Sequence, residues 1–105
     1  MVMIGTRPQN KYDRVIVGNI AHYEVYFNIE FNRDRGLYQW EVVRVDEMKY
    51  DKLVSAIIKS HFNDDKIQAI INNYLLDPNE EHVKEFNELQ EWRKRSKQIA
   101  KEILA

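Results

Sequence analysis

The sequence contains no cysteine, so it can form no disulfide bond, no thiol nucleophile and no thiolate metal site. Glycine and proline are scarce, with three and two copies in 105 residues, which argues against long disordered or low-complexity segments. No apolar run approaches the roughly 18 residues of a membrane-spanning helix, and residues 1–10 lack the apolar core of a signal peptide. We therefore expect one globular domain in a reducing compartment, without membrane contact.

The chain also has no excess of charge of one sign, because its 16 Lys and Arg residues are balanced by 17 Asp and Glu residues, for a formal net charge of −1. A domain that binds duplex nucleic acid usually carries a net basic footprint. The composition therefore weakens a nucleic-acid function without excluding one that is confined to a local basic surface.

Residues 13–46 show the pattern of an antiparallel meander. A strand at 13–17 leads into Gly18-Asn19, a glycine-first pair that is typical of a type II′ hairpin turn. Apolar and polar residues then alternate, which predicts a half-buried second strand. Its apolar members are Tyr23, Val25, Phe27, Ile29 and Phe31.

A loop at residues 33–36 predicts the register between the second strand and a third strand that starts at Leu37. A four-residue loop brings apolar residues together on one face, whereas a slip by one residue would place them opposite polar ones. The predicted pairs are Phe31 with Tyr38, Ile29 with Trp40, and Phe27 with Val42. On this face, Tyr38 and Trp40 are expected to be core residues rather than a ligand cage.

The second face of this sheet is also apolar at one end. In the predicted register Val43 lies beside Tyr26, and Val45 follows on the same side. Either a bulge bends the third strand near Val43, or this face is covered by residues 1–12, by a helix or by another subunit.

The second half of the chain predicts three helices. Residues 49–60 have apolar positions at helical spacing. Asn63 is suited to cap a second helix, and Asp77 with Pro78 at the next position is suited to start a third. The third helix would run about 27 residues, or about 40 Å, which exceeds the roughly 34 Å diameter of a compact domain of this length.

The final helix carries an apolar stripe between charged flanks, a pattern that suits packing against another helix. Its acidic first half and basic second half follow the order that the helix dipole favours. Together with the second sheet face, the stripe gives the candidate interface residues Tyr26, Val43, Val45, Trp92, Ile99 and Ile103. The alternative is a nucleic-acid contact with Trp92 stacked on a base, through Arg93, Lys94, Lys97 and Lys101.

Residues with catalytic chemistry form no recognisable motif. His22, His61 and His82 are widely spaced, and the chain has no HExxH, phosphate loop or GxSxG sequence. We therefore predict no catalytic site, no metal and no cofactor, since an enzyme would need a cleft in which histidines or carboxylates converge.

Three helical segments carry a resemblance to known proteins: YDKLVSAI at 50–57, DDKIQAIINNYL at 64–75 and EFNELQEWRKRSKQIAKEI at 85–103. They resemble small uncharacterised proteins that are encoded in phages and prophages of gut anaerobic bacteria. The stretch EWRKRSKQI is also loosely similar to the ends of phage tail-fibre assembly proteins. The resemblance implies phage accessory or structural work in the bacterial cytoplasm, with a virion-associated location as the alternative, and it implies no catalytic residues.

The sequence thus predicts a single α+β domain over residues 1–105. A loosely held arm at 1–12 precedes a three-stranded antiparallel meander at 13–46 and three helices at 49–105, the last one long. The predicted function is that of a non-enzymatic accessory protein that binds a protein partner or itself, as a homo-oligomer, and nucleic-acid binding is the alternative.

Overall fold

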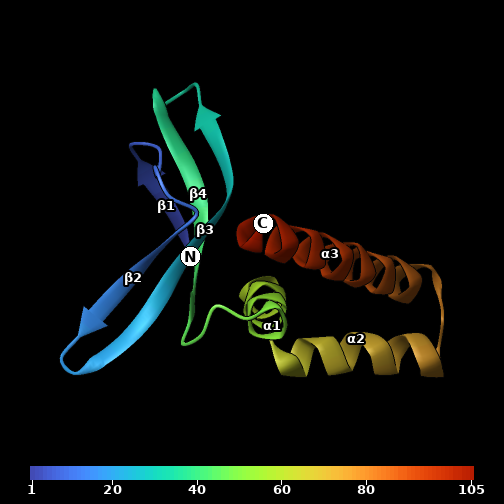
Figure 1. Cartoon of the computed structure of the whole chain (residues 1–105). Coiled ribbons are helices and arrows are strands. Elements are labelled where there is room, and N and C mark those ends of the chain that lie inside the picture. Colours follow the sequence, from blue (N-terminus) through green and yellow to red (C-terminus); the bar gives the residue numbers. More distant parts are fainter.

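A four-stranded antiparallel sheet is followed by three helices, of which the last is the longest (Figure 1). The computed structural model describes all 105 residues. The strands are β1 Val2–Gly5, β2 Tyr12–Val17, β3 Ile20–Asn32 and β4 Leu37–Val45. The helices are α1 Tyr50–His61, α2 Asp64–Leu76 and α3 Glu80–Leu104. The predicted α+β class and the three helices are confirmed.

The sheet has four strands rather than the predicted three, because residues 2–5 form β1. β1 pairs with β4, so the sheet order is β1-β4-β3-β2 and the segment between β1 and β2 crosses from one sheet edge to the other. This is a Greek-key order, in which three hairpin-linked strands gain a fourth neighbour through a longer connection. The prediction that residues 1–12 form a loose arm is therefore wrong for 2–5. Their short run, VMIG, shows no alternation, and its strand conformation depends on the distant β4.

The hairpin between β3 and β4 has the predicted loop at residues 33–36 and the predicted pairing of Phe31 with Tyr38. Further from the loop the prediction fails, since Phe27 lies opposite Glu41. The structure therefore contradicts the predicted pair of Phe27 with Val42. The predicted pair of Ile29 with Trp40 falls in the irregular stretch between Phe27 and Glu30, where no regular pair forms.

A β-bulge causes this difference, because the register shifts between Phe27 and Glu30 of β3. Within the bulge, Asn28 has a φ of +51° and is the only non-glycine residue with positive φ. The extra residue reverses the phase of the side-chain alternation along the strand. Of the two alternatives near Val43, the bulge lies in the partner strand β3 instead. Val43 is paired with Val25, and residues of α1 and α3 cover its side of the sheet.

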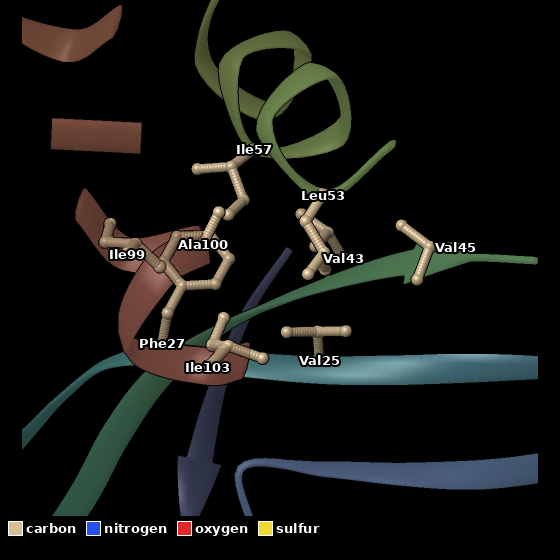
Figure 2. Close-up of a cluster of buried hydrophobic side chains, with 9 residues drawn as sticks. All are labelled: Val25, Phe27, Val43, Val45, Leu53, Ile57, Ile99, Ala100 and Ile103. Atoms are coloured by element: carbon tan, nitrogen blue, oxygen red, sulfur yellow. The ribbon is translucent and has the colours of Figure 1, made fainter. Parts of the chain in front are cut away.

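The core lies between one face of the sheet and the helices α1 and α3. Figure 2 shows that β3, β4, α1 and α3 all contribute side chains to it. Its nine buried residues are Val25, Phe27, Val43, Val45, Leu53, Ile57, Ile99, Ala100 and Ile103. We call this side of the sheet the helix-facing side and the other side the open face.

Asparagine side chains cap two of the three helices. Asn63 accepts a hydrogen bond from the backbone N–H of Lys66, as predicted for the start of α2. At the start of α3 the cap is Asn79, which accepts from the backbone N–H of His82. The predicted cap at Asp77 is wrong, because this residue instead ends α2. Asparagine and aspartate are nearly equivalent as caps, so the sequence did not separate the two positions.

The molecule is elongated, with a radius of gyration of 16.1 Å against about 13 Å for a compact domain of this length. α3 has 25 residues and is about 37 Å long. α2 lies alongside the N-terminal part of α3 and farther from the sheet than α1 (Figure 1), and the rings of Tyr74 and Phe86 stack there with centroids 4.0 Å apart. None of the helices is both long and apolar enough to cross a membrane.

Candidate functional site

The open face of the sheet holds a cleft of about 410 Å³, which we call the open-face cleft. Strand alternation places apolar residues of β1 and β4 on this face, and the segment between β1 and β2 contributes Pro8. The cleft is lined by Met1, Met3, Pro8, Asp13, Glu24, Tyr26, Trp40, Val42 and Arg44. Apolar clefts with a few polar groups are the usual form of a binding site.

Polar contacts fix several residues of the open-face cleft. The Tyr26 hydroxyl donates to Asp13 Oδ2 at 2.8 Å. Burial, followed by this hydrogen bond, raises the pKa of Tyr26 to about 12, so the phenol is neutral in ordinary buffers. Glu24 forms an ion pair with Arg44 at 3.6 Å. The indole Nε1 of Trp40 is buried without a hydrogen-bond partner, and such a group is rare in a folded protein.

β1 forms one margin of the open-face cleft and is also an edge strand of the sheet. Met1 and Val42 exchange two backbone hydrogen bonds, at 2.9 and 3.3 Å. In an antiparallel ladder such pairs alternate, so Met1 and Met3 point their backbone groups toward β4. The backbone N–H and C=O groups of Val2 and Ile4 therefore point outward, and we call this row the free edge of β1.

A polar network joins the sheet to the helices at the bulge. Glu41 contacts His61 Nε2 through one carboxylate oxygen and accepts a hydrogen bond from Asn28 Nδ2 at 2.6 Å through the other. Arg95 of α3 donates to Asn28 Oδ1 at 3.3 Å. The His61 ring stacks flat on Trp92, with centroids 3.7 Å apart. We call these five residues the junction network, and it explains why the strained backbone of Asn28 is retained.

The junction network lies beside a polar cleft of about 590 Å³ that contains Glu30, Glu41 and His61. Histidine and carboxylates therefore converge there, as an enzyme would need. However, both oxygens of Glu41 are engaged, and no serine or threonine lines the cleft to act as a nucleophile. No group of histidine and acidic side chains is placed to hold a metal ion. The arrangement braces α1 and α3 against the sheet.

A second surface lies between α1 and α3, where a groove of about 820 Å³ has a basic wall formed by α3. We call it the basic groove, and it contains all four residues of the predicted nucleic-acid contact. Its lining residues are Val54, Ile58, Gln90, Arg93, Lys94, Lys97, Gln98 and Lys101. Trp92 is outside it, because its indole N–H donates to the carbonyl of Ile57 at 3.2 Å and its ring faces His61.

The candidate interface residues are mostly internal. The four apolar members Val43, Val45, Ile99 and Ile103 are buried in the core of the single chain, so they present almost no surface to a partner. Trp92 is half-buried against that core. The spacing of these residues along the helix and the strands correctly predicted that they are buried. The residues that bury them belong to the same chain and not to a partner.

Tyr26 is the one candidate interface residue on the open face, where it is paired with Val42 instead of lying beside Val43. Tyr38 and Trp40 also lie on the open face and are half-buried, contrary to the expected place in the core. The bulge accounts for all of these differences, because it exchanges the two faces beyond Phe27.

Sequence reasoning missed Met3, Asn28, Glu41 and Arg95. One signal was present, since the apolar phase of β4 changes between Val42 and Val43 and this change requires a bulge. The pattern does not say which strand holds the extra residue.

Comparison of the chain with protein-family models, with curated proteins and with solved structures found no match.

Proposed function

We propose that this chain is a non-enzymatic interaction protein that self-associates by pairing the free edge of β1 with the same edge of a second copy. The observation that carries the proposal is an edge strand with neither charge nor proline, VMIG, whose outward backbone groups are unpaired. Natural sheets usually protect such edges with charged residues, proline or a covering segment.

The surroundings of β1 are apolar and open. Met1, Val2 and Ile4 are exposed by 78%, 65% and 41%. The opposite edge strand, β2, carries Asp13 and Arg14, which are the charges expected on a protected edge. The two edges therefore differ, and β1 is the one that favours strand addition.

The hydrogen-bond pattern supports one register for the pairing. The outward groups belong to Val2 and Ile4, so an antiparallel second copy forms most bonds with Val2 opposite Ile4 and a two-fold axis at Met3. Each of the two Val2–Ile4 pairs exchanges two bonds, and a two-fold interface is self-complementary by construction. No charged side chain of β1 is brought next to its own copy.

The pairing also extends an apolar surface, because Met1 and Met3 line the open-face cleft. With the axis at Met3, the clefts of both copies meet on one side of an eight-stranded sheet. Four-residue strands bury less than the roughly 1,600 Å² of a standard interface, so we expect reversible association in the micromolar to millimolar range.

A cysteine placed at the axis tests this register, and the absence of native cysteine gives a clean background. In the proposed pair the Cα atoms of Met3 and its copy are about 4.5 Å apart, within the range for a disulfide. We expect Met3→Cys to form a covalent dimer under mild oxidation on a non-reducing gel. The matched control Val2→Cys should not, because its two copies are offset by two residues and lie beyond about 7 Å.

Cross-linking of Val2→Cys in preference to Met3→Cys would reject this register. Sedimentation velocity of the wild-type chain gives an independent measurement, since the mean sedimentation coefficient should rise with concentration. A single monomeric species up to millimolar concentration would reject self-association itself. The phage origin stays a prediction, and the genes beside this one would test it.

A further inference from the structure

The cations of the basic groove are distinguished by their grouping, because four of them line one groove and none has an acidic partner. On α1 and its cap, Lys49, Lys52 and Lys59 form ion pairs with acids at 2.8, 3.3 and 3.7 Å. The four cations of the groove form no ion pair, and all four come from one flank of α3.

The helix dipole accounts for only part of this charge. Its effect on a side chain falls off within the last turn of a helix, and Lys101 is the only basic residue in the last turn of α3. Arg93, Lys94 and Lys97 lie one to two turns earlier and gain little from the dipole. Since like charges repel along a helix face, their clustering without acids costs free energy in the isolated chain.

We infer that the basic groove binds the phosphodiester backbone of a single-stranded nucleic acid. Residues 93 to 101 span about 12 Å of helix, so the cations form a row that suits regularly spaced phosphates rather than one compact anion. The groove lies between two packed helices, whose axes are typically about 8–10 Å apart, so it admits one strand. A duplex, whose major groove alone is about 12 Å wide, is too broad to enter it. Val54 and Ile58 form an apolar floor suited to sugar rings.

The groove also predicts how the strand is recognised. No aromatic side chain lines it, so bases have no stacking platform, and Gln90 and Gln98 supply the only neutral amide groups. Binding therefore depends on phosphate contacts and is nearly independent of sequence. The binding is weak, because the chain as a whole carries a net charge of −1.

Salt dependence gives the quantitative expectation. Each phosphate contact with a single strand contributes about −0.7 to the slope of log K against log salt. Four contacts give a slope of about −2.8, so affinity should fall about 50-fold between 50 and 200 mM salt.

The probe is a fluorescein-labelled 20-nucleotide oligo-dT strand, followed by fluorescence anisotropy over a range of salt concentrations. The test variant is Lys94→Gln/Lys97→Gln/Lys101→Gln, and we expect it to bind at least 10-fold more weakly at 50 mM salt, with a slope smaller by about 2. The matched control removes three cations outside the groove, Arg33→Gln/Arg35→Gln/Lys84→Gln, and should bind within twofold of the wild type. Circular dichroism melts confirm that both variants are folded.

Three results would overturn the inference. They are the absence of binding at 50 mM salt, equal losses in the test and control variants, and an affinity that does not change with salt. Two competitors test the identity of the ligand. Duplex DNA that binds more tightly than the single strand overturns the single-strand assignment, and inorganic polyphosphate that competes better at equal phosphate concentration overturns nucleic acid as the ligand. The inference does not depend on pairing of β1.

Discussion

The two faces of the sheet differ in what covers them. The helix-facing side is covered by α1 and α3, and Val25 in its centre has no exposed surface. The open face carries nearly as many large apolar residues, including Trp40 and Val42, but only the segment between β1 and β2 crosses it. The difference teaches that apolar content alone does not decide which face of a sheet becomes the core.

What decides between the faces is the single extra residue in β3. Upstream of Asn28 the odd-numbered apolar residues point to the helices, and downstream Phe31 points to the open face. The helices therefore cover only the part of β3 before the bulge, where the apolar side chains point toward them. Beyond the bulge the helix-facing side is polar, and Glu30 and Gln39 share a hydrogen bond there.

The largest effect should come from a cavity under the helix-facing side. Leu53 of α1 has no exposed surface, so we expect Leu53→Ala to lower the free energy of unfolding by about 3 kcal/mol. Val42→Ala on the open face removes fewer contacts and should cost less than about 1 kcal/mol. Urea denaturation followed by tryptophan fluorescence measures both values. Equal losses would show that the open face is packed as tightly as the core.

The bulge itself can be tested at Asn28. Asn28→Gly keeps the positive φ without strain and loses the hydrogen bonds with Glu41 and Arg95, which should cost about 1 kcal/mol. Asn28→Ala loses the same bonds and adds the left-handed penalty, for a total of about 2 kcal/mol. Urea midpoints at constant slope give the comparison. An alanine variant as stable as the glycine variant would mean that the backbone at this position is not strained.

A pH-dependent effect is expected on the open face, at Tyr26. The folded pKa of Tyr26 is raised to about 12 by burial and by its bond to Asp13, so the folded state holds this proton more tightly than the unfolded state does. The stabilising contribution is therefore complete below the ordinary tyrosine value near pH 10 and is lost as pH rises toward 12. We expect the difference in unfolding free energy between the wild type and Tyr26→Phe to shrink between pH 9 and pH 11.5. A constant difference would indicate that Tyr26 titrates normally.

The smallest effect on folding, and a clear effect on association, is expected at the free edge of β1. Val2→Lys places a charge on an exposed position and should change stability by less than about 0.5 kcal/mol. It should nevertheless abolish the concentration dependence of sedimentation, since lysine protects sheet edges. Ile16→Lys makes the same change on β2, where the exposure is 60%, and should leave association intact. If only Ile16→Lys prevented association, β2 would be the pairing edge.

Local sequence signals predicted the helices and hairpins well. Periodicity located α1 within one residue, and Gly18 takes the positive φ that the first position of a type II′ turn requires. The Asn63 cap and the loop at 33–36 were likewise readable, because each depends on residues that are neighbours in the chain.

Features that depend on contacts between distant parts of the chain were not predicted from the sequence. β1 is a strand because it pairs with β4, and no pattern within VMIG predicts this pairing. Both faces of β3 carry apolar residues, so the pattern was compatible with a bulge in β4 near Val43 as well as with the observed bulge in β3. The basic groove was visible only as one flank of a helix, and its apolar floor comes from α1.

The long connection to β1 has a kinetic consequence. Val17 and Ile20 pair across a two-residue turn, whereas Met1 and Val42 meet from 41 positions apart. Closing the longer loop costs more chain entropy, so β1 should dock after the hairpins have formed and should also detach first in the native state. Amide hydrogens of β4 that face β1 should accordingly exchange faster than those that face β3. A second copy on the outer side of β1 would hold this strand in place, and slower exchange at Val42 with rising concentration would report it.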